Sequence, residues 1–225
     1  MQMKFGAVMT AFIVVALTAV SSFGSSINMG ISGDARVGQD YIDFGVFPFG
    51  GPYAPAPGFG LFEVTWPVTG FFAANGVTAG QFGSIQSFDS TLERAGTPIS
   101  PAVEFMTFNN GGSNLELFLT ELSQGNLPIP PPSPFILSDT PAGASAAFDV
   151  AGYVLNVNDN SQTPFTGVFS ATFSGITADQ LIDSLPVDTT FSATLTLTPT
   201  PEPVSLLLLA TGLLGVGIFG RRKLS

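Results

Sequence analysis

The residues best suited to chemistry in this 225-residue chain are carboxylates and amides, because the sequence contains neither Cys nor His. Without these two types there is no Ser-His-Asp triad, no thiol nucleophile, no zinc-finger site and no His-ligated haem. Paired carboxylates can cleave a glycosidic bond. A sugar-cleaving site also brings several aromatic side chains, whereas this chain has one Trp and three Tyr. We therefore predict that the protein is not an enzyme. The carboxylates weighed for this role are Glu63, Glu93, Glu104, Glu116 and Glu121.

Oxygen-rich segments offer a second kind of site, because Ca²⁺ takes carboxylate, amide and carbonyl oxygens as ligands. One cluster is Asn156, Asn158, Asp159 and Asn160, and another combines Asp34, Asp40 and Asp43. Neither cluster has the spacing of an EF-hand loop, and Asn and Asp commonly form turns instead. The prediction is that the protein needs no cofactor, with structural calcium at the first cluster as the alternative.

Aromatic side chains near Pro-rich segments suggest a third kind of site. Trp66 and Tyr53 are suited to stack on sugar rings, which would give a carbohydrate-binding face. The alternative is that Trp66 is a core residue of the strand that contains Phe62–Trp66. The sequence leaves both interpretations open.

Charge is distributed unevenly along the chain. All sixteen acidic residues lie between Asp34 and Glu202, where Arg36 and Arg94 are the only basic residues, so this segment carries −14. Binding to nucleic acid requires a basic face. We therefore predict that nucleic acid is not a partner.

Both ends of the chain are apolar. Lys4 precedes the run Phe5–Val20, and a segment rich in small residues follows, which is typical of a secretory signal peptide over residues 1–24. Near the other end, the run Val204–Phe219 is followed by Arg221, Arg222 and Lys223. This pattern predicts a transmembrane helix whose basic end stays in the cytoplasm.

The segment before the second apolar run contains Pro201, Glu202 and Pro203. Closely spaced prolines favour an extended backbone that a processing enzyme can grip. Together with the apolar run and the basic tail, residues 199–225 resemble a PEP-CTERM sorting signal. The resemblance implies export through the inner membrane of a Gram-negative bacterium and cleavage near Pro-Glu-Pro by an exosortase. The alternative is a permanently anchored protein with a proline-rich stalk.

The body between the two ends has a period-two pattern, which is typical of half-buried antiparallel strands. Thr177–Leu185 is its one predicted helix, and Pro128–Pro134 is a predicted stiff loop. Many short strands with Gly- and Pro-rich connections predict an all-β antiparallel sandwich or jelly roll over residues 25–198. The predicted strands are Tyr41–Phe47, Leu61–Val68, Val103–Phe108, Leu115–Leu119, Ala146–Val157, Phe169–Phe173 and Phe191–Thr198.

These observations predict an exported protein that ends at the cell surface or in an extracellular biofilm matrix. Its expected partners are the export machinery, the exosortase and, transiently, the inner membrane. A structural or interaction role without catalysis is the preferred interpretation. The alternative is a carbohydrate-binding module that holds extracellular polysaccharide.

Overall fold

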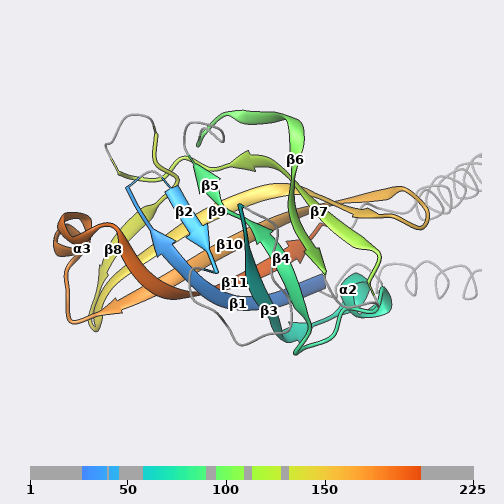
Figure 1. Ribbon diagram of the computed structural model, residues 1–225, viewed down its shortest axis with the longest axis horizontal. Coiled ribbons are helices and arrows are strands. Elements are labelled where there is room, and N and C mark those ends of the chain that lie inside the picture. Colours follow the sequence, from blue (N-terminus) through green and yellow to red (C-terminus); the bar gives the residue numbers. More distant parts are fainter. Residues whose placement is uncertain are drawn as a thin grey trace, which may run out of the picture. The chain divides into compact units, whose positions relative to one another are not determined.

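The computed structural model describes residues 27–39, 41–45, 58–89, 95–108, 113–127 and 132–198 (Figure 1). Residues Ser26–Pro199 form one compact unit. The predicted signal peptide, the predicted transmembrane helix and the basic tail all lie outside the described residues. Among the described helices, none combines the length and the apolar character that crossing a membrane requires.

The body consists almost entirely of strands, as the period-two pattern predicts. Within its described residues, two short helices interrupt the strands, α2 (Gly70–Ala74) and α3 (Ala178–Ser184). The described strands are β1 (Ile27–Val37), β2 (Tyr41–Phe44), β3 (Phe59–Val68), β4 (Phe82–Gln86), β5 (Phe88–Asp89), β6 (Pro98–Phe108), β7 (Leu115–Leu122), β8 (Ile136–Thr140), β9 (Gly143–Asn156), β10 (Ser161–Ser174) and β11 (Val187–Leu197).

Eight strands form a closed antiparallel barrel, in the order β1-β3-β4-β6-β7-β9-β10-β11, with β11 pairing back to β1. The closing pair runs the full length of both strands, from Ile27 opposite Leu197 to Val37 opposite Val187. Strands β2 and β5 extend the sheet beside β1, and β8 pairs with β9. The predicted sandwich or jelly roll is therefore wrong. Strands that alternate buried and exposed residues occur both in sandwiches of two facing sheets and in closed barrels. Which of the two architectures forms depends on the pairing of strands that are distant in the sequence.

Phenylalanine fills the centre of the barrel. Phe148 and Phe169 stack with ring centroids 4.7 Å apart and an angle of 10° between their planes. Phe44 and Phe191 meet edge to face at 5.0 Å, and Phe105 is fully buried nearby. Side chains of alternating residues along each strand supply these rings, which explains the strict inward and outward alternation of β10 and β11.

The two helices lie at opposite ends of the barrel (Figure 1). Phe72 of α2 is fully buried in the main core. Leu181 of α3 packs in a smaller cluster with Ala144, Ala171 and Phe173. The helix predicted over Thr177–Leu185 is confirmed as α3.

Four strands were not predicted from the sequence: β1, β4, β5 and β8. Strand β1 does carry the period-two signal, because Met29, Ile31, Ala35 and Val37 all face inward. Gly33 interrupts the apolar alternation. A side chain there would meet the ring of Phe191 at 2.7 Å, so this position has room only for glycine.

Candidate functional site

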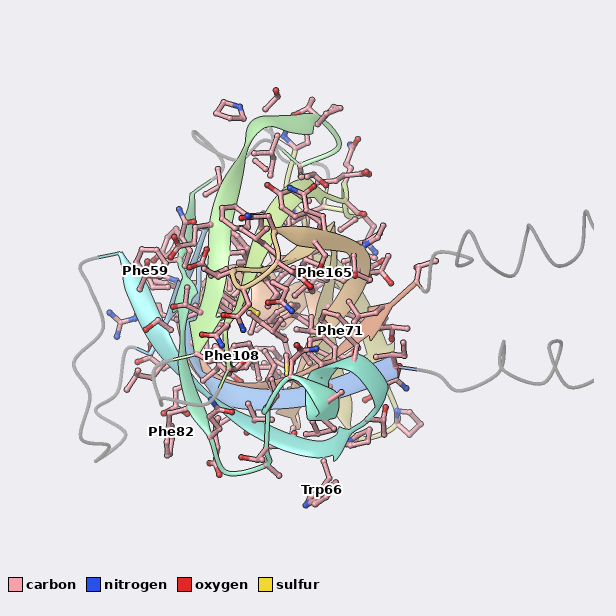
Figure 2. The ribbon with its side chains drawn as sticks, turned by 90° about the vertical axis from the view of Figure 1, so that its right-hand side faces the viewer. Phe59, Trp66, Phe71, Phe82, Phe108 and Phe165 are labelled. Carbon is pink, nitrogen blue, oxygen red and sulfur yellow. The ribbon has the colours of Figure 1, made fainter. Side chains whose placement is uncertain are left out.

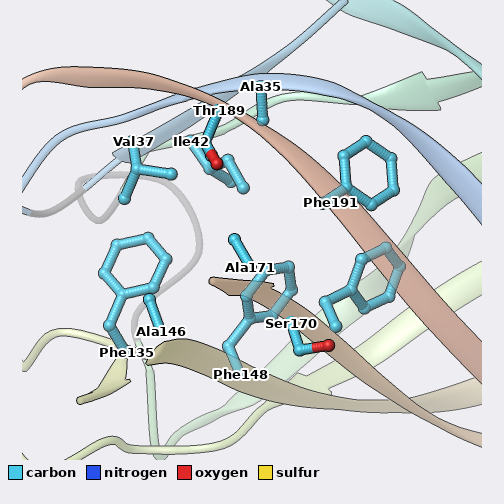
Figure 3. Close-up of a pocket in the computed structure, with 11 residues that line it drawn as sticks. Ala35, Val37, Ile42, Phe135, Ala146, Phe148, Ser170, Ala171, Thr189 and Phe191 are labelled. Carbon is cyan, nitrogen blue, oxygen red and sulfur yellow. The ribbon is translucent and has the colours of Figure 1, made fainter. Parts of the chain in front are cut away.

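One cavity lies inside the barrel (Figure 3), and its wall includes Ala146 and Ala171, which pack with Leu181 of α3. Its volume is about 10 Å³, which is room for a single water molecule. The ring of Phe148 and the methyl groups of Ala146 and Ala171 form part of its wall. None of the cavity-lining residues is titratable. They are Ala35, Val37, Ile42, Phe135, Ala146, Phe148, Phe169, Ser170, Ala171, Thr189 and Phe191.

The described carboxylates that were weighed for glycoside cleavage lie on three strands, of which β6 and β7 are paired neighbours. Glu63 is on β3, Glu104 is on β6, and Glu116 and Glu121 are on β7. Glu93 lies outside the described residues. Across the described ranges, no three Asp, Glu, His or Cys side chains gather closely enough to hold a metal ion.

The first calcium candidate is the turn that joins β9 to β10. The Asn156 side-chain oxygen accepts a hydrogen bond from the backbone N–H of Asn158 at 3.0 Å. Asp159 Oδ1 accepts one from the backbone N–H of Ser161 at 2.9 Å, and Asn160 has a positive φ of 56°. The hydrogen bonds from Ser161 hold the pKa of Asp159 below its ordinary value. These oxygens thus form the turn, and calcium binding here stays an untested alternative to the prediction that no cofactor is needed.

The second acidic cluster contains a cation that the sequence analysis did not consider. Arg36 on β1 donates from Nε to Asp188 Oδ1 at 2.6 Å and from Nη2 to Asp188 Oδ2 at 2.9 Å. Asp43 lies opposite Arg36 on the other side, on β2. Burial raises the pKa of Asp34, whereas the hydrogen bonds from Arg36 lower the pKa of Asp188. Asp40 lies outside the described residues.

Trp66 is a surface residue, and the interpretation that it belongs to the core is wrong. Its exposed fraction is 79%, the largest among the exposed large apolar residues of the described chain. Figure 2 shows the indole projecting away from the barrel beyond the ribbon of β3. Tyr53, its proposed companion in sugar binding, lies outside the described residues.

A β-bulge places Trp66 outside the barrel. In the pairing of β3 with β1, Thr65 lies opposite Gly30 and Val68 lies opposite Met29, so Trp66 and Pro67 have no partner positions on β1. Bulges of this kind redirect side chains. The bulge passes close over Gly30, where a Cβ would meet the Trp66 carbonyl oxygen at 2.8 Å. Gly30 therefore allows the close approach that sets the position of Trp66.

The chain after the bulge is held back onto β1. The backbone N–H of Asn28 donates to Thr69 Oγ1 at 2.9 Å, and the backbone N–H of Thr69 donates to the Asn28 carbonyl at 3.0 Å. Val68 returns to the core with an exposed fraction of 8%. The bulge is thus fixed on both sides, at Gly30 and at Thr69.

The outer face beside Trp66 is rich in hydroxyl groups. Thr194 and Thr196 of β11 lie opposite Gly30 and Asn28 of β1. On β10, Thr166 lies opposite Thr196. The outward hydroxyl residues of these strands are Ser32, Thr65, Thr166, Ser170, Thr172, Ser174, Thr190, Ser192, Thr194 and Thr196. The outer face of β3, β1, β11 and β10 carries few charged side chains. They are Asp34, Glu63 and, at the end away from Trp66, the ion pair of Arg36 with Asp188.

The described barrel ends at Thr198, and Pro201 follows three positions later. Residues 199–223 match the PEP-CTERM protein-sorting motif. No curated protein and no solved structure matches the chain. The resemblance recognised in the sequence is confirmed.

The PEP-CTERM motif implies export, sorting to the cell envelope or surface, and processing by an exosortase. Its processing residues Pro201, Glu202 and Pro203 and its basic residues Arg221, Arg222 and Lys223 lie outside the described residues. The body ends beside its own beginning, because Leu197 pairs with Ile27. The first and last strands of the described body are therefore neighbours in the barrel.

Proposed function

We propose that the protein is a non-enzymatic component of the cell surface or extracellular matrix of a Gram-negative bacterium. The PEP-CTERM motif at residues 199–223 carries this proposal. Export machinery takes the chain through the inner membrane, and the exosortase then releases the body by cutting near Pro201-Glu202-Pro203. The barrel is the part that reaches the surface or the biofilm matrix.

Two features support a role without catalysis. The cavity in the described barrel has room for one water molecule, and its walls carry no titratable group. Across the described residues, no three Asp, Glu, His or Cys side chains lie close enough together to hold a metal ion. An acidic, hydroxyl-rich exterior also suits a protein that stays dispersed in an aqueous matrix.

Substitution of Pro201-Glu202-Pro203 by three alanines tests the sorting proposal. We expect the variant to accumulate uncut in the inner-membrane fraction, because the exosortase loses the segment that it recognises. Immunoblots of membrane, surface and medium fractions measure the result. A matched control replaces Leu185-Pro186-Val187 by alanine, which leaves Pro-Glu-Pro intact. Release of mature triple-alanine protein at the normal level would overturn the proposal.

One observation favours a second role, that of a carbohydrate-binding module. Trp66 is displayed at the surface with an exposed fraction of 79%, while the other described aromatic residues are at least partly covered by the fold. An exposed aromatic side chain does not contribute the free energy of burial to the stability of the fold. Such side chains commonly take part in binding instead.

A further inference from the structure

We propose that the outer face of β3, β1, β11 and β10 around Trp66 binds neutral polysaccharide, with the indole as a stacking platform. This inference rests on the proposed export to a polysaccharide-rich surrounding. It goes further than that function, because it names the site and the class of ligand. It also assigns a role to Gly30, which positions the platform without touching the ligand.

The first argument is that the exposure of Trp66 results from a well-defined bulge in a strand that is otherwise packed on the core. The residues before and after the bulge, Val64 and Val68, are both buried, so β3 remains seated on the core. Between Glu63 and Val68, only Trp66 and Pro67 have no partner position on β1. Burying a large apolar side chain stabilises a fold, but Trp66 is left largely exposed. The hydrogen bonds between Asn28 and Thr69 hold the bulge in place.

The second argument concerns the chemistry of the surrounding face. Threonine and serine hydroxyls both donate and accept hydrogen bonds, as sugar hydroxyls do. Thr194 and Thr196 on β11 and Thr166 on β10 are arranged in register next to the β1 positions over which the bulge passes. An aromatic face with rows of hydroxyls fits a sugar chain, which offers apolar C–H faces and polar edges in alternation.

The third argument is electrostatic and excludes anionic polymers. The segment from Asp34 to Glu202 carries −14. The only basic residue in its described part, Arg36, is engaged by Asp188. Apart from Arg36, the described residues of this face include no cation that could balance a carboxylated or sulfated polysaccharide, which the acidic body repels. A neutral glycan carries no such penalty.

Trp66 is the only tryptophan of the chain, so its fluorescence reports on this site alone. The full chain, kept in a detergent without a sugar headgroup, is titrated with soluble β-1,3- and β-1,4-glucan oligosaccharides. Retention on the corresponding insoluble glucans is measured in parallel, with alginate as the anionic comparison. We expect a blue shift of the emission, protection from acrylamide quenching, retention on at least one neutral glucan and no retention on alginate.

Substitutions at the site separate stacking from other contributions. Trp66→Ala should weaken retention about tenfold or more, the loss typical of an aromatic hot spot, and Trp66→Phe should restore part of it. Val157→Ala, at an exposed apolar residue outside this face, should bind as the wild type does. Because Trp66 is outside the core, its variants should keep the wild-type melting temperature. Gly30→Ala should weaken binding by displacing the bulge.

Several outcomes would overturn the inference. These are the absence of retention on every neutral glucan tested, equal retention of Trp66→Ala, or preferential retention on alginate. A blue shift that depends on protein concentration without glycan would assign the face to a second copy of the chain instead. None of these results bears on the sorting proposal, which is tested separately by substitution of Pro201-Glu202-Pro203.

Discussion

Arg36 is the one basic side chain in the part of the body that the structure describes, and it lies where β1 meets β11. Its guanidinium holds both carboxylate oxygens of Asp188, at 2.6 and 2.9 Å, across the strand pair that closes the barrel. Asp43 faces it from β2. Planar bidentate pairs of this kind are geometrically specific. Arg36 thus ties the first strand to the last and offsets repulsion among its acidic neighbours.

We predict that Arg36→Gln lowers the melting temperature at pH 7. The pKa of Asp188 is lowered in the folded state, mainly by the hydrogen bond from Arg36. The contribution of this pair is therefore fully present above the ordinary pKa of 3.8 and is lost as the pH falls through the lower folded value. The difference in melting temperature between variant and wild type should close in acid.

Thermal melts followed by circular dichroism between pH 7 and about pH 3 measure this difference. Arg36→Lys keeps the charge and loses the bidentate geometry, so it should fall between the two. Equal melting of Arg36→Gln and wild type at neutral pH would contradict the prediction. A deficit that persists unchanged in acid would contradict it too.

At the scale of elements, period-two alternation identified the strands that bury large side chains on one face. Phe191, Ala193, Leu195 and Leu197 of β11 face inward, as the sequence pattern predicts. Strands rich in glycine and serine were not predicted, because small side chains do not produce a clear alternation of apolar and polar residues. One example is β4, which contains Gly83 and Ser84. Helix α2 escaped because five residues are too few to show helical periodicity. The helix is held in place by Phe72, which is fully buried in the core, and no local sequence pattern predicts this contact.

Neighbouring residues of β10 give a direct test of this alternation. Phe169 is fully buried and contacts the rings of Phe44, Phe105, Phe148 and Phe191, whereas Val168 is 52% exposed. Phe169→Ala should lower the free energy of unfolding by about 3–5 kcal/mol, the cost of deleting a buried ring. Val168→Ala should change it by less than about 0.5 kcal/mol.

Urea denaturation measures both free energies. Val168→Ala is the matched control, because the two positions share a strand and differ only in the face they occupy. Similar losses for the two variants, or a larger loss at Val168, would mean that β10 pairs one residue out of the register described here.

At the scale of the whole molecule, the processing signal could be identified from the sequence and the topology could not. Pro-Glu-Pro, an apolar run and a basic tail are contiguous, so their spacing is visible in one dimension. Closure of the barrel depends on pairing Ile27 with Leu197, which are far apart in the chain. The bulge that exposes Trp66 depends likewise on a long-range register shift between β1 and β3. Alternation within a strand carries no information about either pairing.

Closure by the last strand predicts that the body folds cooperatively only when β11 is present. A chain that ends at Leu185 lacks β11 and leaves the edges of β1 and β10 unpaired. It also exposes the rings of Phe44 and Phe169, which contact Phe191 at 5.0 and 5.8 Å. We expect this chain to bind the dye ANS and to show no cooperative melt. A chain that ends at Thr198 keeps the closed barrel without the sorting motif and should melt cooperatively, so the comparison isolates β11. A cooperative melt of the shorter chain at the temperature of the longer one would show that the barrel does not need its closing strand.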